Sequence, residues 1–445
     1  MKPSRYNIFV PTTGAVLGFN TYTNTYLAMS HKAYDGFKAF EASGDFSALC
    51  STFPNVYGKM LGAGFMIPDD GDELAMLRFQ NKQACFASRD LQLMVYPTQD
   101  CNLCCWYCYE SHVPNTRMTP EVMKSVIRYV EQQLAVNAFD SIRLSFFGGE
   151  PLTDFEHIAY PLALEVKRMV EDAGKKFSCF IVTNASLIDT HMVEQLRQIA
   201  PIFQITLDGC REKHDKVRKG KHGGEPTYDH IMWALRTLAD CEEIIPLGIT
   251  LRINYDNETL QRIQEVLDDL EGIDKRKLYV HFERVWQTSD SVDTEQRKQV
   301  LNTLRQFVKR GYAVSHGAFS RKAIACPADT NSLVIVNYDG SVHKCNGRTL
   351  TSQTAYGTLY ADGHLVWNTQ ALANRIGQST FENPACLQCR MLPLCMGPCS
   401  QKLLEHGGYD SNICSMRAID TSLHEYLLLD FQTKRLISQY KAELV

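Results

Sequence analysis

The sequence has none of the long apolar, basic or repetitive segments that would set it apart from ordinary globular proteins. No apolar run approaches the roughly 18 residues that span a bilayer. The opening segment MKPSRYNIFVPTTG has no long apolar core and no small-residue cleavage site, so it is not a signal peptide. The formal net charge is −4, which leaves no overall basic field for nucleic acid. We therefore expect a cytoplasmic protein with neither membrane nor nucleic-acid partners.

Length and composition indicate a folded chain of several domains. Hydrophobic residues make up 44% and charged residues 22% of the 445 residues, which is ordinary for globular proteins. At about 150 residues per domain, the length predicts about three domains. We expect four segments: a small α+β unit over 1–88, an α/β unit over 89–312, a cysteine-rich unit over 313–415, and a terminal helix over 416–445.

Residues 1–88 have the pattern of a small winged-helix-like domain. Short β-like runs come first, separated by turn residues, and helical patterns follow. The expected strands are Tyr6–Val10, Ala15–Phe19 and Thr25–Met29, and the expected helices are His31–Ala42 and Asn55–Leu61.

From residue 91 onwards, apolar strands alternate with amphipathic helices. The strands are expected at Leu91–Pro97, Ile142–Phe147, Phe177–Asn184, Ile202–Asp208, Leu247–Asn254 and Leu278–Val285. The helices are expected at Pro120–Val136, Phe155–Asp172, Asp189–Ile199, Tyr228–Leu238, Glu258–Leu270 and Thr294–Arg310. This alternation predicts a parallel sheet with helical crossovers. Six units make a partial (β/α)6 TIM-like barrel, in which chemistry is expected at the carboxyl ends of the strands.

The segment 313–415 differs in texture. Two hairpins are expected, Ser332–Asn337 with Ser341–Lys344 and Thr358–Tyr360 with His364–Trp367, because each turn contains Asp-Gly. Long apolar elements are scarce here, so we expect metal clusters to contribute stability. Thr421–Glu443 follows as a helix with one apolar face.

The distinctive feature of the sequence is its clustered cysteines. There are 16 cysteines, and ten of them fall in two patches. A reducing compartment makes clustered cysteines more typical of metal binding or catalysis than of disulfides. The scattered cysteines are interpreted as small buried hydrophobes: Cys50, Cys85, Cys104, Cys179, Cys210 and Cys241.

The first patch reads Cys-Asn-Leu-Cys-Cys-Trp-Tyr-Cys over residues 101–108. Cys101, Cys105 and Cys108 could hold three corners of an iron–sulfur cube and leave the fourth iron open to a small molecule. A structural zinc site remains an alternative, although it would want four ligands in paired spacing. Using Cys104 as the fourth would strain the adjacent pair.

This patch resembles the signature of the radical S-adenosylmethionine (SAM) enzymes, in particular their peptide-modifying branch. The resemblance rests on Cys-x3-Cys-x2-Cys with Tyr107 before the last cysteine, and on four further segments at strand ends. These are Phe147-Gly148-Gly149-Glu150-Pro151, Thr183-Asn184, Thr206-Leu207-Asp208-Gly209 with His214-Asp215 and Arg218, and Arg252-Ile253-Asn254. Ala185 departs from the glycine that the family has after Thr-Asn.

The resemblance implies a catalytic [4Fe-4S] cluster on Cys101, Cys105 and Cys108, with SAM bound to its open iron. It also implies SAM contacts from Tyr107, Gly148, Gly149, Glu150, Asn184, Thr206 and Arg218. Arg218 is a candidate partner for the methionine carboxylate, because arginine offers a planar fork to carboxylates. An electron donor such as flavodoxin or ferredoxin is implied as a partner.

The second patch closely resembles the SPASM extension of radical enzymes that act on peptides and proteins. That pattern implies two auxiliary iron–sulfur clusters of the [4Fe-4S] type, which brings the total to three. The distal cluster would take Cys386, Cys389, Cys395 and Cys414, and the proximal cluster Cys326, Cys345 and Cys399. The proximal set would then lack a fourth thiolate, which Asp329 or water could replace. Taken alone, the patch would also suit zinc.

Two enzyme readings compete, together with one that is not enzymatic. The first is maturation of a ribosomally made precursor peptide by a thioether or C–C crosslink, with the peptide's leader added as a strand at Thr25–Met29. The second is anaerobic sulfatase maturation by formylglycine formation, which is weakened because Asn346 stands where those enzymes carry an acid after Cys345. The third is a peptide-binding module without catalysis.

Overall fold

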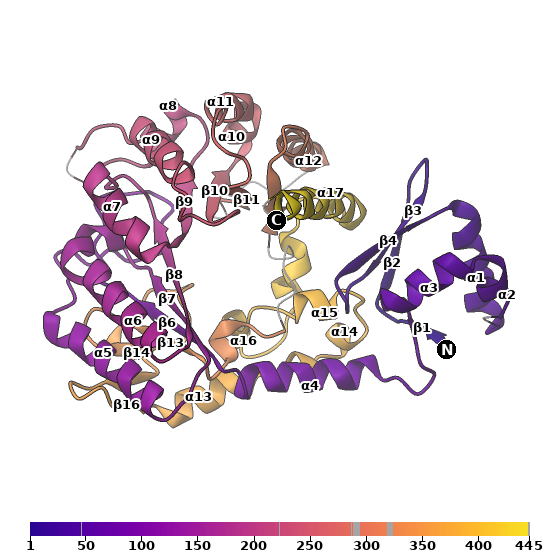
Figure 1. Cartoon of the computed structure of the whole chain (residues 1–445), viewed down its shortest axis with the longest axis horizontal. Helices are drawn as coiled ribbons and strands as arrows, with labels where there is room; N and C mark the ends of the chain where they lie inside the picture. Colours follow the sequence, from indigo (N-terminus) through magenta and orange to yellow (C-terminus); the bar gives the residue numbers. More distant parts are fainter. Residues whose placement is uncertain (46, 222, 286, 288–293, 318–323, 444–445) are drawn as a thin grey trace. The chain divides into compact units, whose positions relative to one another are not determined.

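The structure is a computed structural model that describes residues 1–445 except 46, 222, 286, 288–293, 318–323 and 444–445. The chain divides into two compact units (Figure 1). The first holds residues 1–85, 318–326 and 377–432, and the second holds residues 86–317, 327–376 and 433–445. Residues 318–323 of the predicted 313–415 segment, and residues 444–445 of the terminal one, lie outside the described residues.

The second unit is built on one large sheet, with the strand order β12-β11-β10-β9-β8-β7-β6-β13-β14-β15-β16. From β6 to β12 the strands are parallel neighbours in sequence order. They are β6 (Asp90–Val95), β7 (Ser141–Phe146), β8 (Lys176–Thr183), β9 (Ile202–Leu207), β10 (Ile249–Tyr255), β11 (Leu278–Arg284) and β12 (Ala313–His316). The predicted α/β fold is confirmed, and the six predicted strands are β6 to β11.

Helices link these strands, and the 3.6-residue periodicity predicted all of them except α8. They are α5 (Pro120–Ala135), α6 (Tyr160–Asp172), α7 (Thr190–Ile199), α8 (Arg211–Val217), α9 (Tyr228–Ala239), α10 (Asn257–Gln261), α11 (Ile263–Asp269) and α12 (Thr294–Lys309). The predicted helix Glu258–Leu270 is divided into α10 and α11. Helix α13 (Thr369–Ile376), which was not predicted, lies later in the chain and links none of these strands. Local sequence fixes their starts: the Thr119 hydroxyl accepts from Val122 N with Pro120 in the first turn of α5, and Asp189 caps α7 in the same way. None of the helices in the described part of the chain is long and apolar enough to cross a bilayer.

The predicted hairpins do not stand apart from the barrel-like sheet. They form β13 (Leu333–Val336), β14 (Ser341–His343), β15 (Gly357–Leu359) and β16 (Leu365–Trp367), and β13 pairs in parallel with β6. Sequence patterns predicted the hairpins from their local turns. The pairing of β13 with β6 joins segments more than 200 residues apart, and no local signal encodes such a contact.

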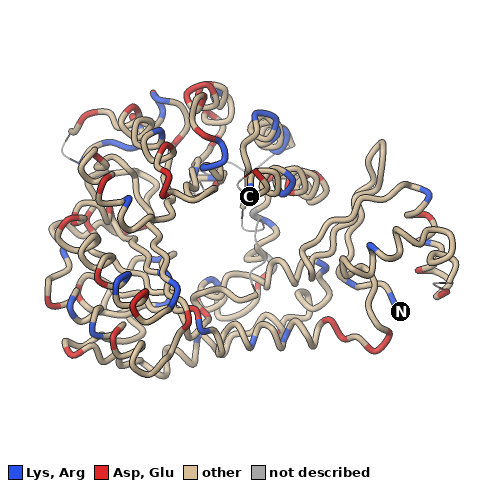
Figure 2. The backbone as a smooth tube through the Cα atoms, viewed as in Figure 1, with Lys and Arg blue, Asp and Glu red and all other residues tan. Residues whose placement is uncertain are grey.

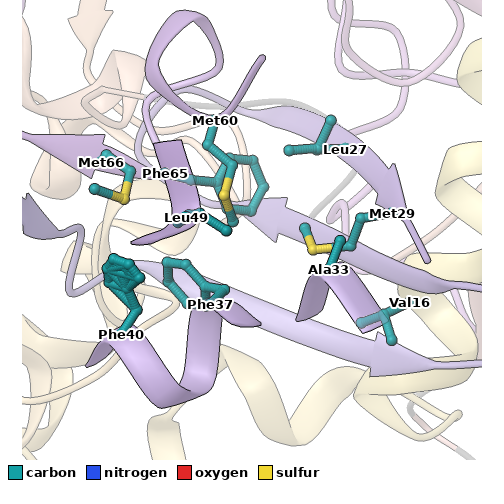
Figure 3. Packing of buried hydrophobic residues seen from close by; sticks show 10 residues of the cluster. All are labelled: Val16, Leu27, Met29, Ala33, Phe37, Phe40, Leu49, Met60, Phe65 and Met66. Atoms are coloured by element: carbon teal, nitrogen blue, oxygen red, sulfur yellow. The ribbon is translucent and has the colours of Figure 1, made fainter. Parts of the chain in front are cut away.

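The first unit contains a three-stranded antiparallel sheet of β2 (Asn7–Pro11), β3 (Val16–Asn20) and β4 (Thr25–Met29). One face packs on α1 (His31–Ser43), α2 (Ser47–Thr52) and α3 (Pro54–Gly62), with Val16, Leu27, Phe37 and Phe65 among the buried side chains (Figure 3). The predicted strands and the two predicted helices are present. The sequence analysis missed α2, the short pair β1 (Lys2–Pro3) and β5 (Met66–Ile67), and α4 (Glu73–Phe86).

The other face of this sheet packs on residues from the far end of the chain. Ile8, Val10, Leu17 and Phe19 share a core with Met391, Leu394, Ile419, Tyr426 and Leu427. The helices of this stretch are α14 (Pro384–Leu387), α15 (Leu392–Cys395), α16 (Ser400–His406) and α17 (Leu423–Ala442), whose last residues belong to the second unit. Residues 1–85 are therefore one part of a larger folding unit.

This shared core predicts the effect of a substitution on α17. Leu427 is fully buried against the sheet, so Leu427→Ala should remove about 2–5 kcal/mol from the stability of the first unit. Leu61→Ala, on α3, is the control, because Leu61 is 36% exposed and should cost less than about 1 kcal/mol. Urea unfolding followed by tryptic cleavage within residues 1–85 would measure both. Equal effects of the two substitutions would contradict a shared core.

Candidate active site

A cavity of about 340 Å³ lies at the carboxyl ends of the strands of the second unit. Its strand side chains come in alternating pairs: Phe180 and Val182 of β8, Gln204 and Thr206 of β9, and Arg252 and Asn254 of β10. The three predicted ligands of the SAM-binding cluster and all the predicted SAM residues line it: Cys101, Cys105, Cys108, Tyr107, Gly148, Gly149, Glu150, Asn184, Thr206 and Arg218. The structure brings them together, while their individual roles remain predictions.

The loop after β6 places the three predicted ligands at the cavity. Cys101 is buried and Cys105 half-buried, and Cys108 N donates to Cys105 O at 3.1 Å. Burial raises the pKa of the Cys101 thiol to about 12. A thiolate at this position therefore needs a positive partner, as a metal cluster provides.

The Gly148-Gly149 turn packs against the backbone just before Cys101. Gly149 N donates to Thr98 O at 3.2 Å, and Glu150 N donates to Asp100 O at 2.9 Å. A Cβ on Gly148, whose φ is +123°, would lie 2.2 Å from Thr98 O, and one on Gly149 would lie 2.0 Å from Asp100 O. The glycines therefore let two backbones meet, which adds a structural role to their predicted contact with a ligand.

Glu150 is almost fully buried, and both of its carboxylate oxygens accept hydrogen bonds from the chain. Oε1 accepts from the Thr183 hydroxyl at 2.7 Å and from Leu152 N at 3.0 Å, and Oε2 accepts from Asn184 N at 2.8 Å. The side chain thus ties the turn after β7 to the end of β8. Its backbone is also engaged, because Glu150 N donates to Asp100 O and Glu150 O accepts from the Thr153 hydroxyl at 2.7 Å.

Arg218 lies in a buried polar network with Asp208 and Tyr107. Its Nη1 donates to Asp208 Oδ2 at 3.0 Å and to the Tyr107 hydroxyl at 2.9 Å. Among the described residues, the buried Arg218 Nε and Asp208 Oδ1 have no hydrogen-bond partner. A buried donor without a partner is costly, so the Nε is suited to an anionic ligand group such as a carboxylate.

His214 and Asp215, quoted for the family pattern, have local structural roles. His214 Nδ1 accepts from Asp208 N at 3.2 Å, and burial lowers the pKa of the ring to about 3, so it stays neutral. Asp215 Oδ1 accepts from Thr227 N and Tyr228 N at the start of α9. The pair holds the β9–α8 corner and the start of α9 in place around Asp208.

Ala185 departs from the family's glycine at a position where glycine would fit better. Its φ is +60° and its side chain is fully buried, a backbone conformation that costs an L-residue about 1–2 kcal/mol. We expect Ala185→Gly to raise the stability of the second unit by up to about 1 kcal/mol, because the relief of strain exceeds the added chain entropy of glycine. A higher thermal unfolding midpoint would agree, and a fall of several degrees would show that the methyl packing outweighs the strain.

The donor set suits an iron–sulfur cube better than a single ion. No three His, Cys, Asp or Glu side chains of the described residues are arranged to hold one metal ion. A cube differs because each iron takes only one protein thiolate. The cavity combines three thiols, a glycine turn packed against their loop, and an arginine Nε that has no hydrogen-bond partner among the described residues. This combination suits a cluster that carries an amino acid-like ligand.

The predicted distal cysteines all lie in the first unit. The pKa of Cys386 is raised, mainly by burial and also by Cys389 and Cys414, and burial with the charges of Cys414 and Cys386 raises the pKa of Cys395 to about 11. Cys386 therefore lies near Cys389 and Cys414, and Cys395 lies near Cys386 and Cys414. Cys389 and Cys395 also pack against the core behind the N-terminal sheet.

The predicted proximal cysteines divide between the units, with Cys326 and Cys399 in the first and Cys345 in the second. This three-cysteine site stays a prediction. Asp329, the suggested weaker ligand, has a competing partner, because its carboxylate pairs with the buried Arg375 at 3.3 Å.

Several cavity residues were missed by sequence reasoning. Gln204, Arg284 and Gln287 line the same space. Gln204 could have been found from strand alternation, since it shares a face with Thr206. Asn346, noted in the sequence only as the residue after Cys345, also lines the cavity, and its place depends on the pairing of β13 with β6.

Comparison with known families agrees with this geometry. Residues 95–282 match the Radical SAM superfamily. These residues are a radical SAM domain. The match runs from the last residue of β6 to most of β11 and includes the three cysteines, the Gly-Gly-Glu turn and Arg218. The prediction of a radical SAM domain is confirmed, and this superfamily implies a [4Fe-4S] cluster and SAM.

Curated relatives match mainly this domain. Protein MJ0907 of Methanocaldococcus jannaschii is 30% identical over 172 residues, 37% of this chain and 54% of that protein. The serine-type anaerobic sulfatase-maturating enzyme of Bacteroides thetaiotaomicron is 25% identical over 34% of this chain and 37% of its own length. The radical SAM cyclopropyl synthase TigE of Paramaledivibacter caminithermalis is 24% identical over 38% and 39%. The chain spans about half or less of the length of these relatives.

Solved structures share the fold over more of the chain. The enzyme anSMEcpe with bound AdoMet has a TM-score of 0.54 at 18% identity, over 79% of this chain and 99% of its own. Streptococcus suis SuiB bound to precursor peptide SuiA has a TM-score of 0.52 at 15% identity, over 93% of this chain and 99% of its own. At these identities the likeness is one of fold.

Proposed function

We propose that this chain is a peptide maturase. The carrying observation is that the three cluster cysteines and all the predicted SAM residues of the second unit line one cavity. Bound there, the cluster and SAM supply a 5′-deoxyadenosyl radical by one-electron cleavage of the sulfonium. The radical would take hydrogen from a ribosomally synthesised precursor, and the product would be a thioether or C–C crosslink.

The chain's own residues hold and orient these groups. Cys101, Cys105 and Cys108 would bind the cluster, and Arg218 would bind the methionine carboxylate through its free Nε. Thr206 and Asn184 stand at strand ends facing the cavity. The β10 side of the cavity, with Arg252 and Asn254, is left for the substrate.

The precursor would be held by residues 1–88. Among the described residues, strand β4 pairs with β3 alone, so it is an edge of its sheet at which an added strand could pair. The opposite edge, β2, already receives a hydrogen bond from Arg390 at Asn7 O, 3.3 Å away. This contrast supports β4 as the leader site. The binding of SuiA by SuiB is the analogy among solved structures.

Anaerobic sulfatase maturation is the second candidate, since an enzyme of that name is among the relatives. One observation weighs against it. The residue after Cys345 does line the cavity, but it is Asn346. Its backbone carbonyl accepts a hydrogen bond from the Tyr109 hydroxyl at 3.0 Å. An amide cannot accept a proton at neutral pH.

The full proposal includes two auxiliary clusters on the SPASM cysteines, an external electron donor and a cytoplasmic location. Co-expression with a short reading frame beside the gene, followed by mass spectrometry of the peptide, tests the reaction. Loss of hydrogens in pairs is expected for a crosslink. Conversion of cysteine or serine to formylglycine in a sulfatase peptide would instead support the second candidate.

A further inference from the structure

The cluster loop reaches the surface beside a cationic segment. Cys104 is exposed and Trp106 is 57% exposed, although both stand between cluster cysteines. The segment 211–221 carries six Lys or Arg and two Asp or Glu, in a chain whose net charge is −4. Lys and Arg as well as Asp and Glu occur in both units (Figure 2).

Backbone hydrogen bonds fasten this segment to the cluster loop. Cys104 N donates to Lys219 O at 2.9 Å, and Lys221 N donates to Asn102 O at 2.9 Å. Leu103 and Gly220 form an antiparallel bridge between them. The exposed loop and the cationic segment therefore make one continuous surface, which we call the cluster-loop face (Cys104, Trp106, Lys216 and Lys219).

Most cations of the segment are already paired. Lys213 pairs with Asp256, Arg218 with Asp208, Lys221 with Asp100, and Arg211 with Asp229. Lys216 and Lys219 are exposed and have no ion pair among the described residues. Their charge is therefore available to a partner, and it lies beside the loop through which an electron must reach the predicted cluster.

We infer that the cluster-loop face docks a small acidic one-electron carrier protein. The inference rests on the proposed function, because the cluster must receive one electron for each SAM cleaved. The reduced carrier loses that electron and the cluster gains it, so no bond forms or breaks in this step. Positive charge beside the entry point speeds the encounter with an acidic partner, and exposed apolar surface at Trp106 adds contact area.

The experiment compares two reductants on the anaerobic holoenzyme. Lys216→Glu with Lys219→Glu should lower flavodoxin-driven formation of 5′-deoxyadenosine by about tenfold or more at low salt, with a smaller effect at high salt. Dithionite-driven formation should stay unchanged, because dithionite needs no docking face. Calorimetry should show flavodoxin binding weakened by a similar factor.

The matched control reverses Lys124 and Lys309, two exposed lysines of the same unit that also have no ion pair among the described residues, which changes net charge equally. If both pairs of substitutions slow the flavodoxin-driven reaction equally, the effect is general electrostatic steering, and the proposal of this docking face is wrong. Unchanged flavodoxin affinity in the Lys216/Lys219 variant would also overturn it. If the wild type forms no 5′-deoxyadenosine with either reductant, the proposed function fails, and the calorimetry alone decides the docking face.

Discussion

Replacement of Cys101, Cys105 or Cys108 by alanine is expected to abolish SAM cleavage. Three of the four irons of the predicted cube each need a protein thiolate, and these three thiols line the cavity together. Losing one leaves two anchors for a cluster that must also keep an open iron. Iron content should fall, and 5′-deoxyadenosine should drop by at least about 1,000-fold, a barrier increase of about 4 kcal/mol.

Cys104→Ala is the matched control on the same loop. Cys104 is exposed, and its thiol donates to Lys219 O at 3.4 Å. We expect this variant to keep its iron and most of its activity. Iron lost from Cys104→Ala but kept in Cys105→Ala would contradict the ligand assignment.

Gly149→Ala should also lower SAM cleavage strongly, although it removes no cluster ligand. The new Cβ would lie 2.0 Å from Asp100 O and 2.7 Å from Gln99 O. The backbone cannot shift there without moving the predicted cluster ligand, because Asp100 directly precedes Cys101 in the chain. The turn and the cluster loop must move apart, and a displacement of about 1 Å can cost 100-fold in rate.

Gly224→Ala provides the comparison within the same unit. Its Cβ would meet its nearest neighbour at 3.7 Å, an ordinary contact. SAM affinity and cleavage should be unchanged in this variant and reduced about 100-fold in Gly149→Ala. Normal SAM affinity in Gly149→Ala would show that the close backbone approach is not needed for the site.

The parts of the fold that local sequence encodes were predictable. Thr119, Pro120 and an apolar stripe predict helix α5, and Asp-Gly pairs predict the hairpin turns. Long-range pairing was not predictable: β13 joins β6, and the N-terminal sheet packs on residues near Leu427. Such contacts depend on how distant segments of the chain come together, which no local sequence pattern encodes.

The candidate site was predictable where chemistry demands particular residue types. Three cysteines and two glycines in fixed spacing identified the part of the cavity wall formed by the loop after β6 and the turn after β7. The dual role of Glu150, whose carboxylate ties β7 to β8, was not visible, because a motif does not reveal which atoms face a ligand. Gln204 and Arg284 were missed for the opposite reason, since they belong to no motif and reach the cavity only by strand geometry.

Isotope transfer tests the central claim most directly. The precursor is made with deuterated residues and incubated anaerobically with the reconstituted enzyme, SAM and a reductant. We predict that deuterium appears in 5′-deoxyadenosine and that the peptide loses hydrogens in pairs, because the radical takes its hydrogen from the peptide. Unlabelled 5′-deoxyadenosine beside an unchanged peptide would contradict peptide maturation, and no 5′-deoxyadenosine at all would indicate a binding module without catalysis.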